Sequence, residues 1–100
     1  MNGSIRTILF LLFLANCGAS PAPEFFGATR HDVRRDGRDY VIFRKESRVE
    51  IIRLGRVKNG DHHKVRATMI ALIPDVTGCE INEKSLQGDS GEMRGSLICE

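Results

Sequence analysis

Serine, histidine and cysteine side chains are the groups of this 100-residue chain that could do chemistry. Ser90 lies in the string Gly88-Asp89-Ser90-Gly91. A serine becomes a nucleophile when a histidine removes its proton and an aspartate orients that histidine. The chain has three histidines, His31, His62 and His63. A small hydrolase that uses Ser90 with a histidine is therefore one hypothesis for the function.

The string around Ser90 resembles the sequence that surrounds the nucleophile of trypsin-like proteases. The resemblance covers four residues and stops at Glu92-Met93, where that family continues with Gly-Pro. The family also needs a histidine and a buried aspartate on a two-barrel scaffold much larger than this chain. We therefore favour a polar turn, in which Gly88 and Gly91 supply positive φ angles and Asp89 or Ser90 bonds local amides.

The histidines do not form a recognisable metal site. His62 and His63 are adjacent, and neighbouring helical residues point about 100° apart, so they cannot chelate one ion as an i, i+4 pair could. His31 could join one of them only through the fold. The sequence therefore predicts neither a metal nor another cofactor.

Cys79 and Cys99 are predicted to form a disulfide. They are the two cysteines that remain if the amino-terminal segment is removed or anchored, and cysteine pairs in exported domains are typically oxidised. Closing a loop of about 21 residues contributes on the order of 3 kcal/mol. That is a large share of the stability of so small a domain.

Residues 1–19 have the layout of a secretory signal peptide. Arg6 precedes an apolar run over residues 8–15, and small and polar residues follow. The run is far shorter than the roughly 20 apolar residues of a membrane-spanning helix. Cleavage after Ala19 would leave residues 20–23 as a linker to a single domain of residues 24–100. We expect this domain to be periplasmic or secreted.

Cys17 offers the alternative of a membrane-anchored lipoprotein. Leu14-Ala15-Asn16-Cys17 resembles the bacterial lipobox, whose cysteine is acylated and becomes the first residue of the mature protein. The string departs from the lipobox at Asn16, where the lipoprotein peptidase prefers Gly, Ala or Ser. A membrane contact is therefore expected only if Cys17 is lipidated.

The rest of the chain predicts an α+β domain with the order β-β-β-α-β-β. Asp36-Gly37 favours a two-residue hairpin turn, because both of its positions need positive φ. Asp61 is suited to cap a helix, and apolar residues at helical spacing follow it until Pro74 ends or kinks the helix. The apolar stripe comprises Val65, Met69, Leu72, Ile73 and Val76, and the predicted strands cover residues 27–35, 38–44, 48–54, 79–83 and 93–99.

These elements suggest a small antiparallel sheet with one amphipathic helix packed on it and one disulfide. If the last two strands pair antiparallel, Cys79 lies opposite Cys99 and Glu83 lies opposite Gly95. The loop between these strands then forms the tip of a hairpin. Its candidate contact residues for a partner are Gln87, Asp89, Ser90 and Glu92.

Charge is distributed unevenly along the chain. Residues 30–66 carry twelve Lys or Arg and six Asp or Glu, whereas residues 67–100 carry two and six. A basic face could bind an acidic protein or an anionic component of the envelope. However, charges of opposite sign are interleaved at the start of the basic stretch, so we favour a solvated surface. Nucleic acid is not an expected partner of an exported protein.

The carboxy-terminal third resembles a group of small exported bacterial proteins of unassigned function. The resemblance rests on Thr77-Gly78-Cys79, on the Gly-Asp-Ser-Gly string and on Cys99. It implies the paired cysteines and the small α+β domain. It implies no activity.

Three functions remain as hypotheses. We favour a non-catalytic exported envelope protein that binds a protein or an anionic envelope component. The first alternative is a secreted inhibitor of a hydrolase, which would use the polar tip of residues 87–92. The second is the small serine hydrolase using Ser90, although we expect no enzyme activity.

Overall fold

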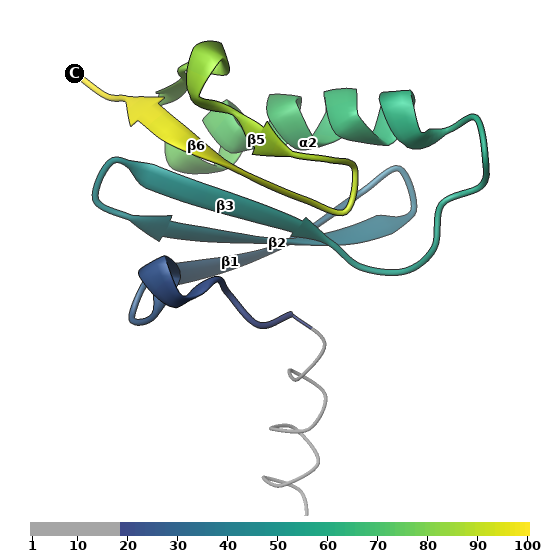
Figure 1. The fold of residues 1–100 in the computed structure, drawn as a ribbon, viewed down its shortest axis with the longest axis horizontal. Helices are drawn as coiled ribbons and strands as arrows, with labels where there is room; N and C mark the ends of the chain where they lie inside the picture. Colours follow the sequence, from purple (N-terminus) through teal and green to yellow (C-terminus); the bar gives the residue numbers. More distant parts are fainter. Residues whose placement is uncertain (1–18) are drawn as a thin grey trace, which may run out of the picture.

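Within residues 19–100, the fold is an antiparallel sheet with one α-helix on one of its faces (Figure 1). The structure, a computed structural model, describes residues 19–100. The sheet has six strands in the order β1-β2-β3-β6-β4, and β5 also pairs with β6. The elements are η1 (Pro23–Phe25), β1 (Thr29–Arg35), β2 (Arg38–Lys45), β3 (Arg48–Arg53), α2 (His62–Thr77), β4 (Glu80–Ile81), η2 (Glu83–Ser85), β5 (Gln87–Gly88) and β6 (Glu92–Ile98). The predicted α+β class is confirmed.

Strands β1, β2 and β3 form the predicted antiparallel meander. Asp36 and Gly37 have φ angles of 52° and 77°, as the two central positions of a tight hairpin require, and Arg35 pairs with Arg38 across them. Strand β1 begins two residues later than predicted. The reason is that the amide of Ala28 still donates to the carbonyl of Phe25, which closes the turn after η1.

Helix α2 buries the predicted apolar stripe except for Val76, which is half-buried. Pro74 does not end the helix, which continues to Thr77. It ends at Gly78, which has a φ of 74° and donates its amide to the carbonyl of Pro74. Asp61 precedes the helix, but its side chain makes no capping hydrogen bond.

Strands β4 and β6 pair in the register predicted from the cysteines. Glu80 lies opposite Ile98, and the sulfur atoms of Cys79 and Cys99 are 2.03 Å apart. The predicted pair of Glu83 with Gly95 does not form, because the side chain of Asn82 accepts a hydrogen bond from the amide of Lys84 and starts η2. The short strand β5, which lies in the segment predicted to be a loop, then pairs with β6.

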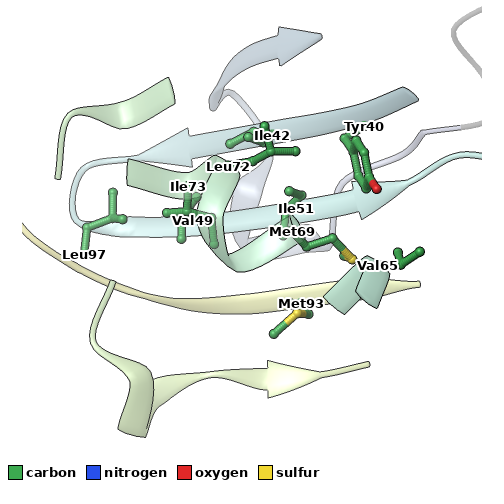
Figure 2. Close-up of a cluster of buried hydrophobic side chains, with 10 residues drawn as sticks. All are labelled: Tyr40, Ile42, Val49, Ile51, Val65, Met69, Leu72, Ile73, Met93 and Leu97. Carbon is green, nitrogen blue, oxygen red and sulfur yellow. The ribbon is translucent and has the colours of Figure 1, made fainter. Parts of the chain in front are cut away.

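The main core lies between α2 and the sheet (Figure 2). Figure 2 shows the helix side chains directed at residues of β2, β3 and β6. Side chains of a strand alternate between its two faces, so only every second residue of each strand can contribute to this core. The ten residues are Tyr40, Ile42, Val49, Ile51, Val65, Met69, Leu72, Ile73, Met93 and Leu97.

A second apolar cluster lies on the opposite face of the sheet, which we call the outer face. Phe25 is 1% exposed there and packs in one cluster with Val41 and Phe43 of β2. The amide of Ala22 donates a 2.9 Å hydrogen bond to the carboxylate of Glu50. Residues 20–23, which the sequence suggests are a linker, therefore belong to a segment that packs on the sheet.

This packing predicts effects of very different size for substitutions at two adjacent phenylalanines. Phe25→Ala should lower the free energy of unfolding by about 3 kcal/mol, because it leaves a cavity under η1. Phe26 is 63% exposed, so Phe26→Ala should change the free energy by less than about 0.5 kcal/mol. Urea unfolding of both variants measures the difference. Equal unfolding midpoints would show that the amino-terminal segment does not stabilise the sheet.

Candidate functional site

The Gly-Asp-Ser-Gly string forms a tight polar turn between β5 and β6. The Asp89 carboxylate accepts a 2.8 Å hydrogen bond from the amide of Gly91. This bond and a second one from the amide of Glu92 lower the pKa of the Asp89 carboxyl below its usual range. Gly88 has a φ of 110°, and any side chain there would collide with the carbonyl oxygen of Glu92. Gly91 does not adopt the positive φ that the sequence suggested.

Ser90 and His62, which are 28 residues apart, are in contact. The Ser90 hydroxyl oxygen lies 2.6 Å from Nδ1 of His62, in the first turn of α2. Ser90 is only 9% exposed, and Arg53 holds its carbonyl oxygen with a 2.8 Å hydrogen bond from Nε. The contact therefore ties the polar turn to the start of the helix.

The Ser90–His62 pair provides the contact between a hydroxyl and a histidine base that nucleophilic catalysis by serine needs. A third group should orient the histidine, but among residues 19–100 the only hydrogen bond recorded for the His62 ring is the one to Ser90. The neighbouring carboxylate, Asp89, bonds the amides of its own turn instead. Ser90 does not line the groove beside Pro74, the one beside Leu54 or the one beside the disulfide.

The four residues predicted to form an interaction tip are not all available to a partner. Gln87 and Asp89 are exposed, and Ser90 is buried against His62. Glu92 belongs to β6, and its side chain is 32% exposed. The disulfide also lies at the other end of β6 and so does not hold this turn directly.

A pair of carboxyl groups on the outer face was not found from the sequence. Glu50 of β3 is 2% exposed and hydrogen-bonds with Glu92 of β6. Burial, reinforced by this hydrogen bond and by repulsion from Glu50, raises the pKa of Glu92 to about 7. Arg94 Nε lies 3.0 Å from Glu92 Oε2, but the two atoms do not form a hydrogen bond, which limits the opposing effect of the arginine. A glutamate between Val49 and Ile51 was the available signal for this site.

Most basic residues of β1, β2, β3 and β6 have a partner. The three arginines of β1 each pair with an aspartate, and Glu24 of η1 lies within ion-pair distance of Arg48 and Arg94. Lys45 donates to the carbonyl of Phe26, and Arg53 to the carbonyls of Ser90 and Gly55. This part of the basic stretch agrees with the favoured interpretation of interleaved charges. The pairs in β1 are Arg30–Asp32, Arg34–Asp39 and Arg35–Asp75.

The basic residues that follow β3 are different. We define residues 55–66 as the basic segment, which comprises the loop after β3 and the first turns of α2. Its four cations are exposed, and none of them forms an ion pair with another residue of the described chain. Its one acidic residue is Asp61. The four cations are Arg56, Lys58, Lys64 and Arg66.

The other predicted features are not assembled into a site. His62 and His63 begin α2, whereas His31 lies in β1. No group of three or more His, Cys, Asp or Glu within residues 19–100 is arranged to hold a metal ion. Cys17 and the predicted signal peptide up to residue 18 lie outside the described residues.

Comparisons with known proteins do not assign this chain to a family. No protein-family model, curated protein or solved structure matches it. The helices found within residues 19–100 are too short or too polar to cross a membrane. The function must therefore be argued from the residues themselves.

The raised pKa of Glu92 predicts a pH-dependent stability. A carboxyl with a higher pKa in the folded state than in the unfolded state binds its proton more tightly when folded. Its contribution to stability is therefore full below pH 4.5 and is lost as the pH rises through about 7. Glu92→Gln should remove this loss and be more stable than the wild type at pH 8 by roughly 1 kcal/mol, a value reduced for the partial exposure of Glu92.

Urea unfolding at pH 5 and pH 8 checks this prediction. Glu83→Gln is the matched control, because Glu83 is exposed and forms no ion pair within residues 19–100. The control should follow the wild type at both pH values. If Glu92→Gln shows the same pH dependence as the wild type, the carboxyl pair does not govern stability in this range.

Proposed function

We propose that this protein is a non-catalytic exported protein that binds an anionic component of the cell envelope through its basic segment. The observation that carries the proposal is the contrast between the two groups of cations. Those on the strands are largely neutralised by carboxylates or bonded to carbonyl groups, whereas Arg56, Lys58, Lys64 and Arg66 have no partner within the described chain.

The start of α2 adds to the positive potential of the basic segment. Amide groups in the first turn of a helix have no partner within the helix and favour nearby negative charge. The first turn of α2 contains no acidic residue, and the side chain of Asp61 makes no capping hydrogen bond. Phosphate or carboxylate groups of a partner would therefore meet both side-chain cations and helix amides.

The lysines and arginines of the basic segment are also expected to make adaptable contacts with the partner. Lysine and arginine side chains on a loop and an exposed helix turn can adjust to phosphate groups at several spacings, so shape selectivity is expected to be low. Exposed charges are screened by salt over about 10 Å at 0.1 M ionic strength. Binding should therefore depend strongly on ionic strength.

Charge reversal in the basic segment tests the proposal. Arg56→Glu/Lys58→Glu should weaken binding to vesicles containing phosphatidylglycerol at least tenfold at low salt, because each charge near an anionic surface contributes about 1 kcal/mol. Binding is measured by vesicle sedimentation, with lipopolysaccharide as a second anionic ligand. The expected wild-type result is binding that falls steeply as salt is raised.

The matched control is Arg34→Glu/Lys45→Glu, which changes the net charge equally. Both side chains are exposed, but Arg34 pairs with Asp39 and Lys45 bonds the carbonyl of Phe26. This control should bind more tightly than Arg56→Glu/Lys58→Glu. Equal losses in the two variants would show that only net charge matters, and binding that ignores salt would contradict the electrostatic proposal.

A second candidate function is the small serine hydrolase, which is favoured by the 2.6 Å contact between Ser90 and His62. Nδ1 of His62 lies where it could accept the proton of the Ser90 hydroxyl. The burial of Ser90 counts against access by a substrate. The inhibitor hypothesis has less support, because only Gln87 and Asp89 of the predicted tip are exposed.

Ser90→Ala separates the two candidates. For a binding protein, we expect turnover of a chromogenic ester to be the same in Ser90→Ala and in the wild type. The free energy of unfolding should fall by about 1 kcal/mol, because the hydroxyl no longer ties the polar turn to α2. Loss of a measurable wild-type turnover in a folded Ser90→Ala variant would instead support the hydrolase.

A further inference from the structure

A groove runs along the edge of the sheet that β4 forms, beside the carboxy-terminal part of α2. Its apolar surface comes from Pro74, Ile81 and Ile98. Ile98 is 55% exposed, which makes it one of the two large apolar side chains that are exposed within residues 19–100. The rim is formed by Glu80, Glu83 and Lys84.

The backbone of β4 leaves a hydrogen-bonding pair available in this groove. The amide of Asn82 donates to the carbonyl of Ser96, and residues of an antiparallel strand alternate between bonding to the neighbour and pointing away from it. Asn82 and Glu80 therefore face β6, whereas the amide and carbonyl of Ile81 point away from it. Ile81 can accept a further strand at this edge.

The acidic residues of the rim have no ionic partner. Glu80 and Glu83 are exposed, and neither forms an ion pair with another residue among those described. Two other carboxylates of the second half of the chain are occupied, since Asp75 pairs with Arg35 and Asp89 bonds its own turn. The one cation at the rim, Lys84, leaves the groove with a negative net charge.

The two residues of β4 place an acidic and an apolar side chain on opposite sides of the sheet. Glu80 pairs with Ile98 and shares its side of the sheet, whereas Ile81 points to the side of α2, where Pro74 lies. An added strand would place alternate side chains on these two sides. Cationic side chains would meet Glu80 on one side, and apolar side chains would pack on Ile81 and Pro74 on the other.

We propose that this edge binds an extended peptide in which Lys or Arg alternates with apolar residues, as an antiparallel strand added beside β4. The opposite edge of the sheet is a poorer site. Strand β1 carries Arg30, Asp32 and Arg34 at that edge, and charged side chains on an edge strand discourage pairing. The peptide is cationic, so the basic segment repels it, and this site can be tested independently of the proposed function.

The probe is an acetylated and amidated eight-residue peptide of alternating Lys and Val, with a fluorescent label. Fluorescence anisotropy at low salt measures its affinity for the wild-type protein. Glu80→Gln/Glu83→Gln should weaken binding about fivefold, because two exposed charge contacts are lost while the shapes of the side chains are kept. The same peptide with Glu in place of Lys should not bind measurably.

The matched control is Asp36→Asn/Glu46→Gln, which removes two exposed carboxylates from the hairpin turns of the meander. It should bind the peptide as the wild type does. Hydrogen exchange then tests the backbone contact. The amide of Ile81 should exchange several-fold more slowly with the Lys-Val peptide, but not with a peptide whose backbone nitrogens are methylated on its pairing edge.

Four outcomes would overturn the proposal. They are the absence of binding at millimolar peptide, equal affinity for the two double variants, equal affinity for the acidic peptide, and an unchanged exchange rate at Ile81. Sedimentation of the protein without peptide tests whether a second copy of the chain occupies the groove instead. If the protein self-associates and Glu80→Gln/Glu83→Gln abolishes this association, a second copy of the chain fills the groove and the peptide proposal is wrong.

Discussion

The structure depends on one constraint, which is that the central strands must be covered on both faces. Residues Tyr40 to Phe43 of β2 are all buried, and successive side chains of a strand point to opposite sides. Two of them therefore need a partner on the side of α2 and two need a partner on the outer face. Helix α2 supplies the first cover, and the amino-terminal segment with Phe25 supplies the second. A slip of one residue in register would exchange the two sets of side chains, so the two-sided burial also fixes the strand pairing.

The outer face also buries a polar group, the carboxyl group of Glu50, beside its apolar cluster. Glu50 is buried there, where its carboxylate binds the amide of Ala22 and its side chain contacts Glu92. Two carboxyl groups in contact disfavour the form in which both are charged, and burial increases the effect. The docking of the amino-terminal segment and the protonation of Glu92 are thus linked through Glu50. Glu92, whose pKa is raised to about 7, therefore lies on the outer face, which the amino-terminal segment covers.

Helix α2 separates two surfaces of opposite charge. The basic segment surrounds its first turn, where helix amides favour anions, and the acidic groove lies beside Pro74 near its last turn. On the strands, Arg30, Arg34, Arg48 and Arg94 lie within ion-pair distance of carboxylates, which reduces the positive charge there. The anionic ligand and the cationic peptide that we propose would therefore bind near opposite ends of α2. The contact between Ser90 and His62 joins the polar turn to the same helix start and so stabilises the basic end of the molecule.

The sequence by itself determined the features that depend on neighbouring residues or on a covalent bond. Asp36-Gly37 sets the first hairpin through its backbone angles, the apolar spacing after Asp61 sets the helix, and Cys79 with Cys99 sets the register of β4 and β6. Only the tertiary structure decided that β6 lies between β3 and β4, because that choice depends on how whole faces are buried. This placement brings Glu50 to Glu92, and the packing of the strands and α2 brings Ser90 to His62. The same packing brings Asp75 to Arg35 and Glu24 to Arg48 and Arg94, because these partners are far apart in the sequence and no local pattern specifies them.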